Sequence, residues 1–288
     1  MLTLLGSTDS ADMAASRQRE LDLPTKVAAA LGRSAVEATT RGYYEFGPGQ
    51  RVDWGHYVKA AQHEKRSIPP DGELLKPPPK VFTQTRVQVS NETTLGAARR
   101  LSDAGMNPLA LNFANGLQAG GGFLGGARAQ EEVLCRSSAL YATLAGDRMY
   151  NAHRERPQPD STDWAIYSPQ VPVFRTDDGT ELEQVWLLSF ITCAAPYAPT
   201  VGQPEAGELL RRRIHRVLAI ARAYEYSALV LGAWGCGAFQ NDPHRTATDF
   251  RHALEHEFSG AFAHVTFAIA DWSPERKYLG PFRDVFSG

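Results

Sequence analysis

The chain has 288 residues, of which 43% are hydrophobic and 22% charged, and this composition is typical of a globular protein with one large or two small cores. The net charge of −2 and the isoelectric point near 6.5 give no overall basic character, so we expect no direct binding of duplex nucleic acid. No run reaches the roughly 20 apolar residues of a membrane span, and the apolar start lacks the basic residues of a secretion signal. We therefore expect no membrane association.

The cysteines and histidines show no metal-binding pattern. Cys135, Cys193 and Cys236 are odd in number and have no CxxC spacing, which fits neither a disulfide framework nor a zinc site. His252 and His256 stand four residues apart, but no cysteine or carboxylate accompanies them at ligand spacing. We expect no metal, no cofactor and a location in the reducing cytoplasm.

The N-terminal part of the chain is rich in helix-forming residues. Residues 13–41 predict two helices, because Pro24 would begin a new one. Residues 42–79 contain Gly-Pro-Gly and Pro-Pro-Pro sequences and predict short strands and turns. The prolines suggest a boundary, with residues 1–79 forming a mainly helical extension that packs on a domain of residues 80–288.

A strand-helix-strand unit follows, at residues 86–90, 94–104 and 108–113. Three consecutive glycines then precede Gln130, Glu131 and Glu132. Glycines occur where the backbone needs positive φ or a ligand approaches closely, although alone they are more often a flexible hinge.

From Glu132 to Leu144 the apolar residues recur at helical spacing, which predicts one helix and places both glutamates on its first turn. Acids are also common there simply because the helix dipole stabilises them. The combination of the glycine loop and the paired acids favours a ligand site.

The middle of the chain predicts a loop and a hairpin. Residues 146–163 are polar and contain proline, which indicates a loop. Residues 164–174 and 184–192 read as strands, and Asp177-Asp178-Gly179 between them is a hairpin turn signal.

The C-terminal part predicts an amphipathic helix at residues 205–224 and a short buried strand at 228–231. A second glycine loop, residues 232–239, leads to Asp242-Pro243, which would cap and start a further helix. Such a loop before a helix N-terminus can bind a diphosphate, and a tight turn is the alternative. A dinucleotide-binding fold would need GxGxxG directly after the first strand, and neither glycine loop has that form.

The first glycine loop resembles the signature of the poly(ADP-ribose) glycohydrolases. The shared pattern is GGG, seven residues and QEE, with Asn115 five residues before the first glycine. The chain looks most similar to the compact bacterial form of that family, over roughly residues 80 to 272. The resemblance implies an α/β macro-domain-like fold, with a mixed β-sheet sandwiched between helices.

The resemblance also implies an activity. The enzyme would cleave ribose-ribose O-glycosidic bonds of poly(ADP-ribose), mainly from the chain terminus, and release ADP-ribose. Its partners would be poly(ADP-ribose), ADP-ribose and poly(ADP-ribosyl)ated proteins, and it would act as a monomer in the DNA damage response. The alternative function is a non-catalytic ADP-ribose reader with the same fold.

The family pattern assigns roles to individual residues. Glu132 would be the general acid and later the base that activates water, while Glu131 orients a ribose hydroxyl. Asn115 would bind ribose hydroxyls and Gln130 would support the loop, although either could be a turn residue or a helix cap. The further substrate-binding residues would be Gly121, Gly122, Gly235, Cys236, Gly237, Ala238 and Phe239.

Two assignments to the aromatic residues stay open at this point. Phe239 would pack against the terminal ribose, but it could equally be a core residue. Adenine would lie near the last strand, around residues 265–270, where Phe267 or Trp272 could stack on it. Either of these could also belong to the core.

Overall fold

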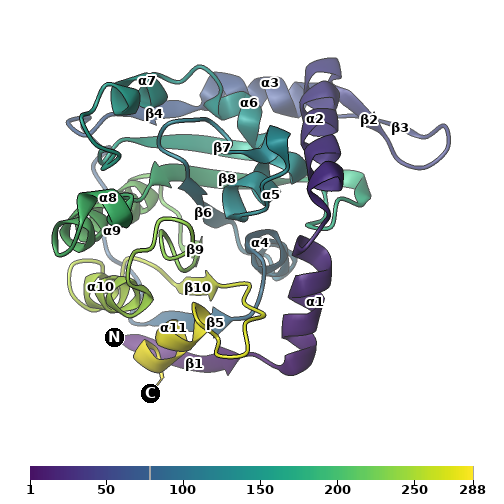
Figure 1. The fold of residues 1–288 in the computed structure, drawn as a ribbon. Coiled ribbons are helices and arrows are strands. Elements are labelled where there is room, and N and C mark those ends of the chain that lie inside the picture. Colours follow the sequence, from purple (N-terminus) through teal and green to yellow (C-terminus); the bar gives the residue numbers. More distant parts are fainter. Residues whose placement is uncertain (78, 288) are drawn as a thin grey trace.

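One mixed β-sheet of eight strands runs through the protein (Figure 1). The structure is a computed structural model that describes residues 1–77 and 79–287. The strand order is β1 (Leu2–Thr8), β5 (Thr85–Ser90), β10 (His264–Ala268), β9 (Ala228–Leu231), β6 (Pro108–Ala114), β8 (Glu181–Ala194), β7 (Ala165–Arg175) and β4 (Arg66–Ile68). The first six are parallel, and β7 is antiparallel to both β8 and β4. A separate hairpin joins β2 (Tyr43–Glu45) and β3 (Arg51–Asp53).

Helices cover both faces of the sheet. One face packs on α9 (Glu205–Ala223), α10 (Pro243–Glu255) and α11 (Leu279–Val285). The other packs on α2 (Thr25–Arg41), α3 (Gly55–Glu64), α4 (Thr94–Asp103), α5 (Gln130–Ser137) and α6 (Leu140–Leu144). The remaining helices are α1 (Ala11–Leu21), η1 (Phe123–Gly125), α7 (Arg148–Arg154) and α8 (Ala198–Val201). The expected mixed sheet between helical layers is confirmed.

The two faces follow from the alternation of side chains along each strand. In β6, Leu109 and Leu111 enter the core beneath α9, whereas Ala110 enters the core on the opposite face. Because β6 is apolar on both faces, it can lie only inside the sheet. The predicted strand-helix-strand unit is therefore confirmed as β5, α4 and β6.

Other predicted elements are also confirmed. The helical region of residues 13–41 divides into α1 and α2, with Pro24 immediately before α2. The turn at residues 177–179 joins β7 to β8, and its glycine has a φ of +95° that other residues rarely adopt. Asp242 caps α10 by accepting a hydrogen bond from the Arg245 backbone.

Three expectations about secondary structure are wrong. The helix that begins near Glu132 ends at Ser137, because Ser138 becomes extended and bridges to Val173 of β7. Residues 146–163 are not all loop, since Asp147 caps α7, which buries Met149. The segment expected to hold only strands and turns contains α3.

The N-terminal segment contributes to the main sheet. β1 pairs in parallel with β5, and β4 forms the opposite edge next to β7. The division at residue 79 stays a prediction, and the middle proline of the boundary, residue 78, lies outside the described residues. Across residues 1–77 and 79–287, no helix has the length and apolar character that crossing a bilayer requires.

Candidate active site

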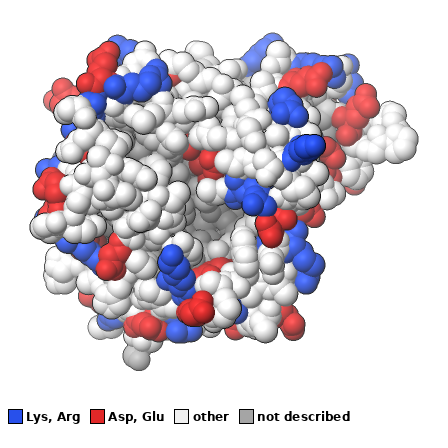
Figure 2. Space-filling view, in the orientation of Figure 1, with Lys and Arg blue, Asp and Glu red and all other residues white. Residues whose placement is uncertain are grey.

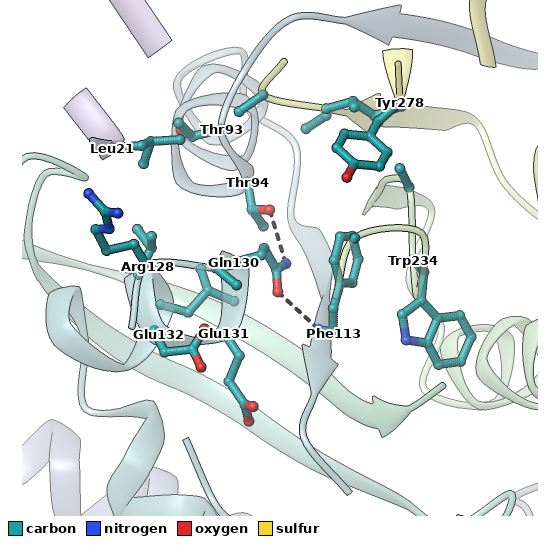
Figure 3. Close-up of a pocket in the computed structure, with 18 of the residues that line it drawn as sticks. Leu21, Thr93, Thr94, Phe113, Arg128, Gln130, Glu131, Glu132, Trp234 and Tyr278 are labelled. Carbon is teal, nitrogen blue, oxygen red and sulfur yellow. Dashed lines mark hydrogen bonds between the residues drawn. The ribbon is translucent and has the colours of Figure 1, made fainter. Parts of the chain in front are cut away.

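A cavity of about 400 Å³ opens at the carboxyl ends of the parallel strands (Figure 3). Its walls are the segments that follow β5, β6, β9 and β10, and the space-filling view shows this hollow in the middle of one face (Figure 2). Open α/β sheets bind ligands at this end of their strands, where neighbouring connections diverge. Both predicted glycine loops start here.

Glu131 is buried at the start of α5, with 3% of its surface exposed. The backbone N–H of Asn115 donates to its Oε2 over 2.7 Å, and Asn112 Nδ2 donates to its Oε1 over 3.3 Å. Burial raises the pKa of Glu131 to about 8, the charge of Glu132 adds to this effect, and the hydrogen bonds oppose it. The Glu131 carboxyl is therefore largely protonated at neutral pH.

Glu132 is half-buried and lies at the edge of the cavity, where the first glycine loop holds it. Its Oε1 accepts a hydrogen bond of 3.0 Å from the backbone N–H of Gly122. Gly121 has a φ of +55°, and a Cβ at this position would lie 2.3 Å from the same oxygen. Gly121 and Gly122 do not line the cavity, and their geometric role is to position the carboxylate; a contact with a ligand stays a prediction.

Gln130 links three elements beneath the site. Its Oε1 accepts from the backbone N–H of Phe113, and its Nε2 donates to Leu111 O and Thr94 Oγ1 at 2.7 and 3.1 Å (Figure 3). The side chain thus fixes the start of α5 against β6 and α4. This is a supporting position, close to the role that the resemblance implied.

Asn115 lines the cavity and also shapes its own loop. Its Oδ1 accepts from the backbone N–H groups of Leu117 and Gln118, which is the turn role left open by the sequence. Only its Nδ2 remains for a ligand, and this atom has no partner among the residues that the structure describes. Asn115 therefore has the turn role, and its contact with ribose hydroxyls stays a prediction.

The second glycine loop lines the other side of the cavity. Gly235 has a φ of +75°, and a Cβ there would lie 2.7 Å from the Cβ of Ala195. Gly237, Ala238 and Phe239 line the cavity, and their consecutive backbone N–H groups donate to no acceptor in the described part of the chain. Such a row of N–H groups suits a diphosphate.

The Cys236 thiol and the start of α10 lie away from the cavity, and a ligand contact at Cys236 stays a prediction. The Cys236 thiol does not line the cavity: it is buried and lies against Trp234 O and Thr246 Oγ1, while the Cys236 backbone N–H donates to Ala233. The N-terminus of α10 does not line it either, and Asp242 already caps that helix. A diphosphate site here would therefore be made by the loop itself.

Two aromatic side chains that the sequence singled out line the cavity. Phe239 is half-buried, lines the cavity and meets Tyr197 edge to face, with ring centroids 5.7 Å apart. Trp272 also lines it and is 38% exposed. Phe267 packs on Phe250 and Phe282 in the core, which is the second of the two alternatives that the sequence left open.

Several cavity residues could not be found from local sequence. Leu21 comes from the end of α1, Asp177 from the β7–β8 turn and Tyr278 from just before α11. Burial raises the pKa of Asp177 to about 6, and Thr93 Oγ1 donates to its Oδ2 over 2.7 Å. The position of Thr93 in the cavity could have been suggested from the sequence, because Thr93 follows a predicted strand whose carboxyl end lies at this face.

The described residues contain no group of three His, Cys, Asp or Glu side chains arranged to hold a metal ion. Metal independence therefore stays a prediction that an experiment must test.

Known proteins resemble the chain in sequence and in fold. A model of the family described as microbial-type PARG (poly(ADP-ribose) glycohydrolase), catalytic domain, matches residues 32–176. The crystal structure of poly(ADP-ribose) glycohydrolase from Thermomonospora curvata is 40% identical, with a TM-score of 0.85 and coverage of 90% of this chain and 99% of that one. The form of that enzyme bound to the inhibitor ADP-HPD matches with the same identity and coverage and a TM-score of 0.82.

Poly(ADP-ribose) glycohydrolase from Deinococcus radiodurans, in complex with ADP-ribose, is 43% identical. The match covers 79% of this chain and 96% of that one, with a TM-score of 0.74. None of the curated proteins matches the chain at a significant level. With a family model over half of its length and a 40% identical relative over 90% of it, the chain belongs to the family of microbial-type poly(ADP-ribose) glycohydrolases.

Proposed function

We propose that this protein hydrolyses the ribose-ribose O-glycosidic bonds of poly(ADP-ribose), mainly from the chain terminus, and releases ADP-ribose. The observation that carries the proposal is the pair Glu131 and Glu132 at one side of a cavity whose other side offers a row of free backbone N–H groups. The relatives bound to ADP-ribose and to ADP-HPD support the same class of ligand.

The terminal ADP-ribose unit would lie with its diphosphate on the loop of Gly237, Ala238 and Phe239. Its distal ribose would then reach the two glutamates, with Asn115 Nδ2 available to a ribose hydroxyl. Glu131 is buried and fixed by two hydrogen bonds, which suits it to orienting that ribose.

Glu132 would carry the proton transfers. Its proton passes to the leaving 2′ oxygen as the bond from that oxygen to the anomeric carbon breaks, and Glu132 then accepts a proton from the water that adds to this carbon. The Gly122 N–H holds the carboxylate afterwards.

We further propose that the enzyme works without a metal, as a monomer, in the cytoplasm and in the response to DNA damage. The three cysteines are free and buried, which agrees with a reducing compartment. A reader of ADP-ribose is the competing function. Paired acids beside an anionic ligand are unfavourable unless they serve a reaction, and this argument supports the hydrolase.

Incubation with automodified poly(ADP-ribosyl)ated protein, followed by identification of the product, tests the proposal. We expect free ADP-ribose as the main product. Glu132→Gln should lower the rate by at least about 1,000-fold, within the range for loss of a general acid, while calorimetry shows ADP-ribose affinity within a few-fold of the native value. Binding without any release of ADP-ribose by the native protein would instead identify a reader.

A further inference from the structure

The cavity accounts for only one side of the scissile bond. In poly(ADP-ribose) the anomeric carbon of the terminal unit is joined to the 2′ oxygen of an adenosine ribose in the next unit. After this bond breaks, the leaving adenosine must lie outside the cavity, beside the acid that protonates its oxygen. The surface next to Glu132 therefore faces the penultimate unit of the polymer.

An exposed leucine stands on that surface. Gly122, which donates to Glu132, leads into η1, and Leu124 follows two residues later with 39% of its surface exposed. Two residues of chain span at most about 7 Å, so Leu124 lies close to the acid. It does not line the cavity, and its side chain is thus available on the outside.

Helix α2 packs closely against η1, the short helix that carries this leucine. Gly32 of α2 allows the chain at Phe123 to approach closely, since a Cβ on Gly32 would lie 2.6 Å from Phe123 O. Gly126 at the other end of η1 is equally close to α2, because a Cβ on Gly126 would lie 2.2 Å from Thr25 O. The exposed face of α2 consequently continues the surface around Leu124.

Two unpaired cations lie on this face of α2. Lys26 and Arg33 are seven residues apart, which places them on one side of the helix, and both are exposed. Arg33 Nη1 donates to Leu124 O over 3.4 Å. Neither residue forms an ion pair with any residue of ranges 1–77 and 79–287, whereas Arg128 nearby is paired with Asp22. In Figure 2, Lys and Arg side chains lie above and to the right of the hollow, on the side where Figure 1 draws α2.

We propose that Leu124, Lys26 and Arg33 form a leaving-side subsite for the penultimate ADP-ribose unit. The adenine of that unit packs on Leu124, and its diphosphate lies against the two cations. The subsite rests on the proposed function, because it presupposes that Glu132 protonates the leaving oxygen. It gives the enzyme a preference for polymer over substrates that lack a second unit.

Two substrates separate the subsite from the cavity. One is poly(ADP-ribose), and the other is ADP-ribose linked at the anomeric carbon to para-nitrophenol, which carries no second adenosine. The test variants are the charge reversal Lys26→Glu with Arg33→Glu, and Leu124→Asp. Arg212→Glu on the exposed face of α9 and Leu75→Asp at another exposed leucine are matched controls.

We expect each test variant to lower kcat/KM for poly(ADP-ribose) by about tenfold, because the charge reversal replaces attraction to the diphosphate with repulsion and Leu124→Asp replaces an apolar contact with a carboxylate. The same variants should leave kcat/KM for the nitrophenyl substrate and the Kd for ADP-ribose within about twofold of the native values, because neither ligand reaches the subsite. The loss from charge reversal should shrink as salt rises. The controls should behave like the native protein on both substrates.

Equal effects on both substrates, or no effect on either, would overturn the subsite. If the native protein cleaves neither substrate, the proposed function itself fails. If the native protein cleaves both substrates and the test variants keep full activity on polymer, only the subsite fails.

Discussion

Replacing Glu131 with glutamine should stabilise the folded protein, and the gain should grow with pH. The carboxyl is 3% exposed, and its pKa rises from 4.5 to about 8 on folding. The unfolded chain loses this proton near pH 4.5, whereas the folded protein keeps it up to about pH 8. Between these values the folded state binds more protons, so the stability of the native protein falls as pH rises.

The shift in the pKa of Glu131 sets an upper limit to the gain in the free energy of unfolding. This gain is about 5 kcal/mol at pH 8 and above, and almost nothing below pH 4.5. For a chain of this size, 1 kcal/mol changes Tm by about 2 °C, so the difference in Tm should approach about 10 °C at most. The glutamine amide can also be satisfied inside the protein. Asn112 Oδ1 is buried without a partner among the described residues, and it can accept a hydrogen bond from this amide once the Asn112 side chain rotates.

Calorimetric unfolding of both proteins from about pH 4.5 to about pH 8.5 measures this directly. Glu183→Gln, at an exposed position, controls for the loss of one negative charge. A Tm difference that does not change with pH, or a variant less stable than the native protein at pH 8, would refute the argument that burial keeps Glu131 protonated.

Three further predictions concern the reaction. Gly121→Ala should reduce the rate of ADP-ribose release by about 100-fold, because the new Cβ displaces the Glu132 carboxylate from its position. Gly125→Ala in the same loop is the control: its new Cβ meets no atom within 4 Å, and the variant should remain active. Prolonged chelator treatment should leave the rate unchanged, and a large loss recovered by Mg²⁺ or Zn²⁺ would contradict metal independence. The last ADP-ribose unit on a protein should persist, because its leaving group is a carboxylate or serine oxygen instead of a ribose 2′ oxygen; mass spectrometry would expose an error here by detecting efficient loss of those mono-ADP-ribosyl marks.

The local chemistry of the chain was readable from its sequence. Apolar runs such as residues 108–113 predict buried strands, and the glycine loops predict sites of positive φ, as found at Gly121 and Gly235. The acids at Glu131 and Glu132 lie on a first helical turn as expected. These features depend on neighbours a few residues away, and such interactions are encoded locally.

Other features depend on contacts between distant segments. The placement of Leu21, Asp177 and Tyr278 around one cavity follows from the packing of α1, the β7–β8 turn and the segment before α11, none of which carries a ligand motif. The helix break at Ser138 is likewise imposed by its bridge to Val173. Local propensity cannot predict a partner that lies tens of residues away in the chain.

The division of roles between the two glutamates also required the tertiary structure. In the sequence they are adjacent acids with the same intrinsic chemistry. Folding buries Glu131 beneath the Asn115 backbone and leaves Glu132 at the cavity edge against Gly122. The sequence alone determined that two carboxyl groups stand together on a first helical turn; burial, which is a property of the assembled fold, raised the pKa of Glu131.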